Sequence, residues 1–555
     1  MYESLGFPNP NRSRLRRWKS SALPALALMG IGLVFAPSAP AQIITKVEGA
    51  EDHRKPIAIL EPTPFRVYQR GNDNRADISI SLSDGLTAED IENVSLFAHH
   101  SDPLKPAIPV DGWSYREGVL KNVPVGGPYL VNVTLKLESV KKLGADATAF
   151  SIGRLFVGDL WVLAGQSNME GVGDLVDVTP PSNLVSLLGM NGKWSKAEEP
   201  LHWLVDSPDP VHSLNPADRE ARSKAFHKAR TKGTGLGLPF ATVLASTTNV
   251  PIGLIACAHG GTSMAQWDPA KKGEGGNSLY GSMLRQFKLA GGKVRGVLWY
   301  QGEAEANPDA SKIYPRVFAD FIAAVRSDFG QPDLPFYLVQ LGRFSNPSDP
   351  KFWNAVQEAQ RLIPDRIPNT AVVAAVDLDL DDGIHIGTPG LKRLGARLAR
   401  IAIREVFGQA GATTPTLERV SKLDDRTLAV KFKGVNRVDG SGFPQTPAHH
   451  YPGFAKILDA PKLGPQEAAP YRGLQPARHI GGFSIRKPDG TIIPIIFDAR
   501  VGPSQDTVLI KLDAACPPGA ELWYGHGLDP YCNLTDALDM AVPVFGPVPL
   551  DPIIK

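Results

Sequence analysis

The chain has 555 residues, an apolar content of 43% and nearly balanced charges, with 59 lysines and arginines against 57 aspartates and glutamates. This length predicts more than one domain, and the apolar content excludes a chain that is disordered throughout. The formal net charge of +2 gives no indication of a surface for nucleic acid or another polyanion.

Residues 1–41 have the pattern of a secretion signal. The basic segment RSRLRRWKS precedes the apolar run ALPALALMGIGLVFA, and PSAPAQ then offers an Ala-x-Ala cleavage site after Ala41. The run is shorter than the ~20 residues that span a bilayer, and Pro24 and two glycines interrupt it. We therefore expect cleavage, export to the periplasm or the extracellular space, and no stable membrane insertion afterwards.

Residues 42–150 contain short alternating or β-branched runs separated by Gly, Pro, Asp and Asn. These runs are FRVYQR, ADISISLS, VSLFAH and PYLVNVTLKL. Such runs joined by turns predict strands, and several together are typical of a small sandwich. We expect an N-terminal β-sandwich-like domain over 42–150.

Residues 151–410 alternate between apolar strands and helical stretches. The predicted strands are GDLWVLAG, PIGLIACA, GVLWYQG, FYLVQLG and TAVVAAVDLDL. In the last helical stretch, Leu391, Leu394 and Leu398 recur at helical spacing, with Thr388 as the expected cap. The alternation predicts an α/β domain with a parallel sheet between two layers of helices, and ligands bind such sheets at the carboxyl ends of the strands.

Residues 411–555 return to the β pattern, in LAVKFKG, GGFSIRKPDGTIIPIIFDARV, DTVLIKLD and AELWYGHG. We expect a C-terminal β-rich domain there. Cys516 and Cys532 flank AELWYGHG, and an exported domain could join them by a disulfide. Cys257, in the apolar GLIACA, fits a small buried hydrophobic residue.

Ser167 lies in VGDLWVLAGQSNMEG, where a polar turn ends an apolar strand. A serine nucleophile needs a base, a group that orients the base, and donors for the oxyanion that develops. The Gly-x-Ser-x-Gly signature of α/β hydrolases is absent. GTSMA is the nearest approach to that signature, so Ser263 is a rival nucleophile.

Two of the twelve histidines follow an aspartate by three residues, in DGIH (Asp382, His385) and DPVH (Asp209, His212). A tight turn can bring such a carboxylate back against the imidazole, which fixes the tautomer. DPVH lies in a Pro-rich segment without a strand before it, and we interpret it as a loop. DGIH directly follows the strand TAVVAAVDLDL, so we expect it at the catalytic edge of the sheet.

Four motifs, GQSNMEG, HGGTSMAQW, VLWYQGEAEA and DGIHIG, resemble in their order those of SGNH-type hydrolases of the sialate O-acetylesterase and carbohydrate acetylesterase family. VPVGGPYLVNVTL and ELWYGHGLDPYCNLTDALDMAVPVFGP resemble the entry and closing β segments of that family. The resemblance implies a flavodoxin-like, three-layer α/β fold flanked by β-rich domains. It also implies an exported serine esterase that removes O-acetyl groups from a sugar or polysaccharide.

The resemblance also implies roles for single residues. Ser167 matches the nucleophile, His385 the base and Asp382 the carboxylate that orients it. The oxyanion hole would consist of three donors: the backbone N–H of Ser167, that of Gly261 (with Gly260 as the alternative), and the side-chain amide of Gln301.

Three further residues near these motifs keep two interpretations each. Glu303 either holds a loop or touches substrate. His259 stands where the family often has an apolar residue, and either contacts a sugar or hydrogen-bonds locally. Trp267 is either a stacking surface for sugar or part of the core, which is the commoner place for a tryptophan beside an apolar strand.

We expect no metal and no cofactor. DLDLDDG, from Asp377, superficially resembles a calcium loop, but its sixth position is Asp382 rather than Gly and its twelfth is Thr388 rather than Glu. The pairs His99–His100 and His449–His450 lack the spacing of metal ligands, and no phosphate-binding loop is present.

Two other functions stay open from the sequence. An esterase of the same fold could act on lipid or another small ester. A non-catalytic carbohydrate-binding protein on this fold would lack a catalytic residue, whereas all of them are present here. The sequence gives no indication of the oligomeric state.

Overall fold

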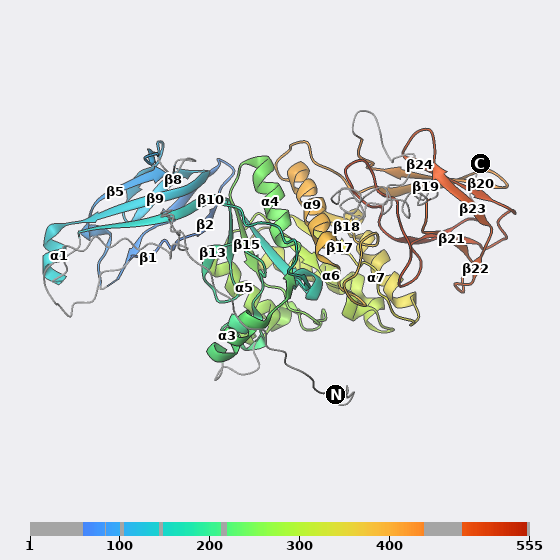
Figure 1. Cartoon of the computed structure of the whole chain (residues 1–555), viewed down its shortest axis with the longest axis horizontal. Coiled ribbons are helices and arrows are strands. Elements are labelled where there is room, and N and C mark those ends of the chain that lie inside the picture. Colours follow the sequence, from blue (N-terminus) through green and yellow to red (C-terminus); the bar gives the residue numbers. More distant parts are fainter. Residues whose placement is uncertain are drawn as a thin grey trace, which may run out of the picture. The chain divides into compact units, whose positions relative to one another are not determined.

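The computed structural model describes residues 59–83, 85–99, 105–143, 148–212, 219–437 and 480–551 (Figure 1). The expected signal segment lies outside the described residues, as do His100 and the pair His449–His450. Within the described ranges, no helix has both the length and the apolar character needed to cross a membrane.

Residues 59–143 are rich in strands, as their alternating runs predict. The elements there are β1 (Ile59–Glu61), β2 (Val67–Gln69), β3 (Arg75–Ser79), β4 (Ser81–Leu82), β5 (Ile91–Ala98), β6 (Ile108–Pro109), β7 (Ser114–Arg116), β8 (Val119–Pro124), β9 (Gly126–Leu135) and α1 (Leu137–Leu143). β3, β8 and β7 form one antiparallel sheet, while β9 pairs with β5 on one side and with β10 (Ala149–Gly165) on the other. The inward-facing apolar side chains of these strands share one core cluster. The domain boundary at residue 150 stays a prediction.

β10 leads into the central sheet. Its other strands are β12 (Val185–Leu188), β13 (Trp194–Lys196), β15 (Ile252–Ala256), β16 (Gly296–Tyr300), β17 (Phe336–Gln340) and β18 (Thr370–Ala374). The five predicted strands lie side by side in the order β15, β10, β16, β17 and β18, each parallel to its neighbour. β15, β16 and β17 are buried at every residue, as expected for parallel strands covered on both faces.

The sheet as a whole is mixed, which corrects the prediction of an all-parallel sheet. β12 extends the sheet beyond β15, and β13 pairs with β12 in the antiparallel direction. These two short strands carry no long apolar run, so the sequence pattern did not predict them. The separate pair β11 (Gly173–Asp174) and β14 (Lys232–Thr234) is antiparallel as well.

Helices follow the strands of the central sheet. They are α2 (Ser167–Glu170), α3 (Arg219–Ala229), α4 (Gly237–Thr248), α5 (Leu279–Leu289), α6 (Ala310–Asp328), α7 (Lys351–Arg361), α8 (Ile363–Arg366) and α9 (Thr388–Glu405). α9 packs closely on α4. A side chain at Gly395 would lie only 2.5 Å from the carbonyl oxygen of Leu236, the residue before α4. Thr388 is the first residue of α9 rather than its cap; its hydroxyl donates to the Asp174 carbonyl.

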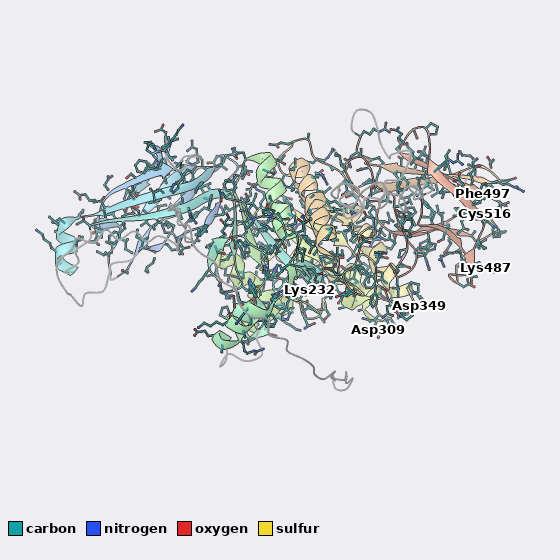
Figure 2. The ribbon with its side chains drawn as sticks, in the orientation of Figure 1. Lys232, Asp309, Asp349, Lys487, Phe497 and Cys516 are labelled. Atoms are coloured by element: carbon teal, nitrogen blue, oxygen red, sulfur yellow. The ribbon has the colours of Figure 1, made fainter. Side chains whose placement is uncertain are left out.

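Two four-stranded antiparallel sheets make up the C-terminal part of the chain. Their strands are β19 (Thr416–Asp424), β20 (Thr427–Lys433), β21 (Phe483–Arg486), β22 (Ile492–Ile493), β23 (Ile496–Val501), β24 (Thr507–Leu512), β25 (Glu521–Tyr524) and β26 (Phe545–Pro549). All three cysteines are free thiols, including the half-buried Cys516 (Figure 2), so no disulfide joins it to Cys532. The boundary at residue 410 stays a prediction.

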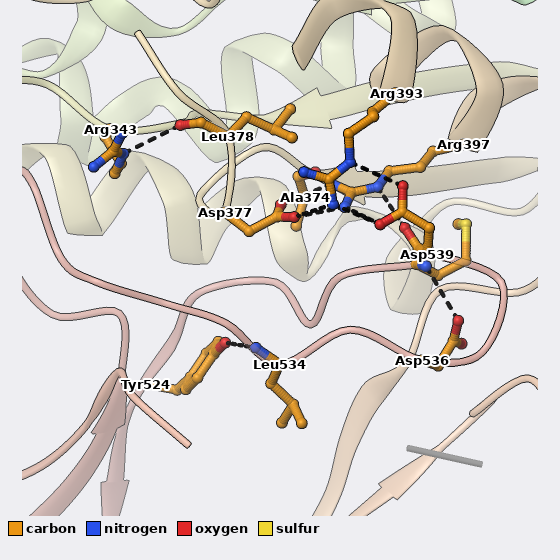
Figure 3. Close-up of polar contacts among 11 residues, drawn as sticks. Arg343, Ala374, Asp377, Leu378, Arg393, Arg397, Tyr524, Leu534, Asp536 and Asp539 are labelled. Atoms are coloured by element: carbon orange, nitrogen blue, oxygen red, sulfur yellow. Dashed lines mark hydrogen bonds and ion pairs between the residues drawn. The ribbon is translucent and has the colours of Figure 1, made fainter. Parts of the chain in front are cut away.

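A buried ion-pair cluster fastens the C-terminal segment to the end of β18 and to α9 (Figure 3). Arg397 is fully buried and donates to both carboxylate oxygens of Asp377, at 2.8 and 2.6 Å, and to the Asp539 backbone carbonyl at 2.6 Å. Burial opposes ionisation of Asp377, but the nearby Arg397 and Arg393 outweigh it and lower the pKa of that carboxyl. The cluster thus anchors the segment that runs from Asp377 to α9.

Candidate active site

The carboxyl end of β10 presents Ser167, the first residue of α2. Gly165, just before it, has a φ of 136°, and a side chain there would lie 2.2 Å from the Tyr300 carbonyl oxygen. Only glycine permits this close approach of β10 to β16. The turn therefore places the Ser167 side chain at the edge of the sheet where strand ends meet, as the sequence predicts.

Ser167, His385 and Asp382 lie in one hydrogen-bonded row. Ser167 Oγ is 2.9 Å from His385 Nε2, and His385 Nδ1 is 2.7 Å from Asp382 Oδ2. Asp382 Oδ1 accepts the backbone N–H groups of Ile384 and His385, each at 2.9 Å. The nucleophile and base assigned from distant motifs are thus in contact.

Asp382 is placed to stay ionised. Its partial burial raises the pKa, but the His385 side chain and the two backbone N–H groups outweigh this and lower the pKa of Asp382 to about 2. A carboxylate has no hydrogen to give, so His385 Nδ1 must carry the proton of that bond. His385 Nε2 is then a lone pair that can accept the Ser167 hydroxyl proton.

Backbone contacts hold the loop that carries His385. Leu380 and Ile386 form an isolated antiparallel bridge, and the N–H of Asp381 donates to the His385 carbonyl at 2.8 Å. The N–H of Ser345, from the segment after β17, donates to the Gly383 carbonyl at 2.7 Å. Asp382 accepting from the N–H two residues on is an Asx turn, a local structure that aspartate favours.

Asn168 was not singled out from the sequence, although it directly follows Ser167. Its Oδ1 accepts the N–H of Ile386 at 3.1 Å, and its Nδ2 donates to Glu303 Oε1 at 2.9 Å. Burial raises the pKa of Glu303 to about 7, against the lowering effects of Asn168 and His385. Glu303 therefore lies behind the base-carrying loop and orients Asn168, which favours the loop-holding interpretation.

Hydrogen bonds distinguish the two glycines that follow β15, Gly260 and Gly261. The N–H of Gly260 donates to Glu170 Oε2 at 2.8 Å, and a side chain at Gly260 would lie 3.4 Å from the Ser167 Cβ. Within the described ranges, the N–H groups of Gly261 and Ser167 donate to no protein acceptor. Of the two glycines, Gly261 is thus the one whose N–H is available to an oxyanion, with a φ of 68°.

Gln301 does not fit its expected role as the third oxyanion donor. It is fully buried, and its Nε2 donates to the Thr262 carbonyl at 3.1 Å and to the Glu305 carboxylate. Both amide hydrogens are therefore used inside the protein. Glu305 in turn accepts the N–H of Met264 at 2.7 Å, so Gln301 fixes the shape of the loop that carries the glycine pair.

Two other candidates are also placed away from the chemistry. Trp267 is fully buried, edge-on to Trp299 at 5.4 Å, and donates its Nε1–H to Thr262 Oγ1 at 3.0 Å, so it belongs to the core. The Ser263 hydroxyl contacts Gln266 Oε1 at 3.3 Å. Among the described residues no histidine contacts Ser263, which leaves this rival nucleophile without a base.

His212, which we interpreted as part of a loop, is buried and lies at the end of a short 3-10 turn. Its Nδ1 lies 3.0 Å from His259 Nδ1, on the residue before the glycine pair. Its Nε2 lies 3.0 Å from Ser282 Oγ, which donates to Asp209 Oδ2 at 2.5 Å. The side chain of Asp209 thus reaches the His212 imidazole through Ser282 rather than directly.

Comparison with known proteins finds related carbohydrate esterases. Residues 157–404 match the family described as carbohydrate esterase, sialic acid-specific acetylesterase. The chain is 27% identical over 264 residues to a probable carbohydrate esterase from Arabidopsis thaliana, covering 43% of this chain and 88% of that protein. It is 25% identical over 300 residues to the human sialate O-acetylesterase, covering 47% of this chain and 54% of that protein.

A solved structure shares the fold over most of the chain. It is a carbohydrate acetylesterase from Xanthomonas citri, with a TM-score of 0.55 and 21% identity, covering 87% of this chain and 97% of that chain. Residues 157–404 therefore resemble the sialic acid-specific acetylesterase family of carbohydrate esterases, and this match and the curated relatives identify the protein as a carboxylic ester hydrolase.

Proposed function

We propose that the enzyme removes O-acetyl groups from an acetylated sugar or polysaccharide, with Ser167 as nucleophile, His385 as base and Asp382 as the carboxylate that orients the base. One observation carries the proposal: the hydrogen-bonded row of these three side chains at the carboxyl edge of the central sheet. The family of residues 157–404 supports the acetyl ester and the sugar.

The first half of the reaction forms an acetyl-enzyme. Ser167 Oγ attacks the acetyl carbonyl carbon while its proton passes to His385 Nε2. The N–H groups of Ser167 and Gly261 donate to the oxyanion, and one such donor is typically worth about 3 kcal/mol of transition-state stabilisation. The bond from the carbonyl carbon to the sugar oxygen then breaks, and His385 returns its proton to that oxygen.

The second half releases acetate. A water molecule takes the place of the sugar, His385 Nε2 removes one of its protons, and the resulting hydroxide attacks the acetyl carbonyl. The bond to Ser167 Oγ breaks, and His385 reprotonates that oxygen. Asp382 stays a carboxylate throughout and stabilises the charged imidazole in both halves.

The direct test replaces the nucleophile. Ser167→Ala should lower kcat for an aryl acetate by about 10⁴-fold or more, because no other group can form the acetyl-enzyme. The matched control is Ser263→Ala, whose hydroxyl has no histidine partner among the described residues and whose loss should change kcat little. An unchanged melting temperature shows that both variants fold. Activity retained in Ser167→Ala and lost in Ser263→Ala would overturn the assignment.

The substrate class has its own test. Acetate release from acetylated xylan and from acetylated sialic acid should exceed hydrolysis of longer-chain acyl esters of the same alcohols. A preference for long acyl chains would instead identify an esterase that acts on lipid.

We also propose that the enzyme is exported after cleavage of residues 1–41, supported by the basic, apolar and Ala-x-Ala order of that segment. The mass of the N-terminal peptide of the mature protein tests this. We expect Gln42 as the first residue, and a retained Met1 in the exported fraction would contradict cleavage.

A further inference from the structure

Beside the nucleophile, four polar side chains form a second hydrogen-bonded row, which we call the histidine row: Asp209, Ser282, His212 and His259. Asp209, Ser282 and His212 are buried, and His259 is half-buried. The esterase mechanism above uses none of them. The direction of each hydrogen bond in the row follows from its buried end.

Asp209 fixes the first bond. Its Oδ2 accepts from Ser282 Oγ at 2.5 Å and from Arg285 Nε at 2.9 Å. Asp209 is ion-paired with the Arg285 guanidinium, and a carboxylate has no hydrogen to donate. The single hydroxyl hydrogen of Ser282 therefore points to Asp209, and Ser282 Oγ can only accept from His212.

This constraint determines which nitrogen of each imidazole carries a hydrogen. His212 Nε2 must carry a hydrogen for the 3.0 Å bond to Ser282 Oγ. Burial lowers the pKa of His212 to about 3, so the ring is neutral near pH 7 and its Nδ1 is a lone pair. The 3.0 Å contact between the two Nδ1 atoms then requires a hydrogen on His259 Nδ1. Burial also lowers the pKa of His259, which leaves its Nε2 as a lone pair.

His259 Nε2 is the open end of the row. Within the described ranges this atom has no hydrogen-bond partner, and it is not a fully enclosed atom. The backbone N–H of His259 donates to the Gly165 carbonyl at 3.0 Å, which ties it to the end of β10. The next residue, Gly260, lies beside Ser167. The residue directly before the glycine pair thus carries a fixed hydrogen-bond acceptor.

We propose that His259 Nε2 accepts a hydrogen bond from a free hydroxyl of the substrate's sugar, and that the histidine row holds it in the acceptor state. The inference rests on the proposed function, because it assigns an alcohol side to the substrate of that site. A sugar ester brings hydroxyl donors beside its acetyl group, whereas an aryl acetate brings none. His259 would therefore select polyhydroxylated esters, and His212 and Ser282 would act as positioning residues.

A spectroscopic test addresses the tautomer without any substrate. The enzyme is labelled with the heavy nitrogen isotope in histidine only, and the His259 signals are assigned by their loss in His259→Asn. We expect a pyridine-type shift for Nε2 and a pyrrole-type shift for Nδ1 near neutral pH. Ser282→Ala should abolish this fixed state, while Ser246→Ala, an exposed serine on α4, should leave it intact. A pyrrole-type Nε2 in the wild type would overturn the inference.

A kinetic test addresses the contact with sugar. The probes are mono-acetylated methyl glycosides of xylose and of sialic acid, each paired with the same ester whose free hydroxyls are methylated. In the wild type, kcat/KM should favour the hydroxylated member of the better pair by about tenfold, as expected for one hydrogen bond. In His259→Asn, which can keep the Nδ1 contact but lacks Nε2, the ratio should fall to about one.

The outcomes separate the two proposals. His227→Asn, which alters an exposed histidine paired with Asp206, is the matched control and should keep the wild-type ratio. An unchanged ratio in His259→Asn would overturn the sugar contact while leaving the esterase intact. Failure of the wild type to release acetate from any of the probes would count against the proposed function, and the nitrogen shifts would still decide the tautomer.

Discussion

The two Asp-x-x-His segments of this chain share a spacing but differ in their structural setting. Asp382 and His385 follow a strand of the central sheet and contact each other directly, at 2.7 Å. Asp209 and His212 end in a short 3-10 turn, and Ser282 stands between their side chains. The first imidazole is partly exposed and faces the Ser167 hydroxyl, whereas the second is buried and faces His259.

The comparison shows what the spacing decides. Three residues are enough to let a carboxylate reach back to an imidazole, but the preceding strand determines whether the pair arrives at the carboxyl edge of the sheet. The ring nitrogen that faces away from the aspartate then determines the chemistry. In one turn it meets a hydroxyl to be deprotonated, and in the other it meets a second imidazole.

Replacing each of the two histidines by alanine is expected to give the largest difference in kcat between the two turns. His385→Ala should lower kcat for an aryl acetate by about 10⁶-fold, because the nucleophile loses its base. His212→Ala should cost far less on the same ester, since His212 does not contact Ser167. Steady-state kinetics of both variants measures the gap. Comparable losses would mean that the two turns are not functionally distinct.

Replacing each of the two aspartates by asparagine tests the same difference between the two turns. Asp382→Asn should lower kcat by about 10⁴-fold, because an amide can hold His385 in the wrong tautomer. Asp209→Asn should leave the direct row of Ser167, His385 and Asp382 in place, and its effect on aryl acetate hydrolysis should be at most about tenfold. A larger effect from Asp209→Asn would place the histidine row in the proton transfer itself.

Stability should also differ between the anchors of the two turns. Arg397→Met leaves the buried Asp377 without its main partner, and should cost about 3–5 kcal/mol of unfolding free energy. Arg285→Met removes a partly exposed partner of Asp209 and should cost about 1 kcal/mol. Arg404→Met, exposed on α9, is the control. Denaturant unfolding ranks the three variants, and equal losses in all would contradict the anchoring role of Arg397.

The pH dependence of stability should also reflect the burial of His212. Burial holds the pKa of His212 near 3, below its ordinary value of 6.5, so the unfolded chain binds more protons than the folded one between these values. Stability from this site is therefore complete above pH 6.5 and lost as the pH falls toward 3. The lowered pKa of Asp382, about 2 against an ordinary 3.8, has the same sign in a more acidic window.

A variant isolates the histidine term. His212→Asn should flatten the dependence of unfolding free energy on pH between 6.5 and 3.8, the range in which Asp382 is still mostly ionised in both states. The difference between wild type and variant at each pH removes the contribution of the other histidines. A difference that stays constant across this window would show that His212 is not buried in its neutral form.

The sequence predicted best those elements that are marked by a run of apolar residues or by a polar turn directly after such a run. The five parallel strands, the Ser167 turn and the DGIH turn were predictable because apolar runs and a strand-end position leave few alternatives. The edge strands β12 and β13 were not, because short strands carry little periodicity. The sequence left open whether Cys516 and Cys532 form a disulfide, and in this structure both thiols are free.

Side-chain partners were harder to predict than positions. Gln301 occupies the expected strand end, but its amide hydrogens are taken by Thr262 and Glu305, a pairing that depends on how two loops fold over each other. Asn168 and Glu303 form their contact across 135 residues, and no local pattern announces it. The link from His212 to His259 is likewise a product of tertiary packing.

The central claim is that the hydroxyl of Ser167 is the group activated by His385. Treatment of the enzyme with an aryl phosphonate, followed by digestion and mass spectrometry, measures this directly. The account predicts one phosphonyl group on the peptide that contains Ser167, formed in the wild type and lost in His385→Ala. Modification of the peptide that contains Ser263, or labelling of Ser167 that does not depend on His385, would contradict it.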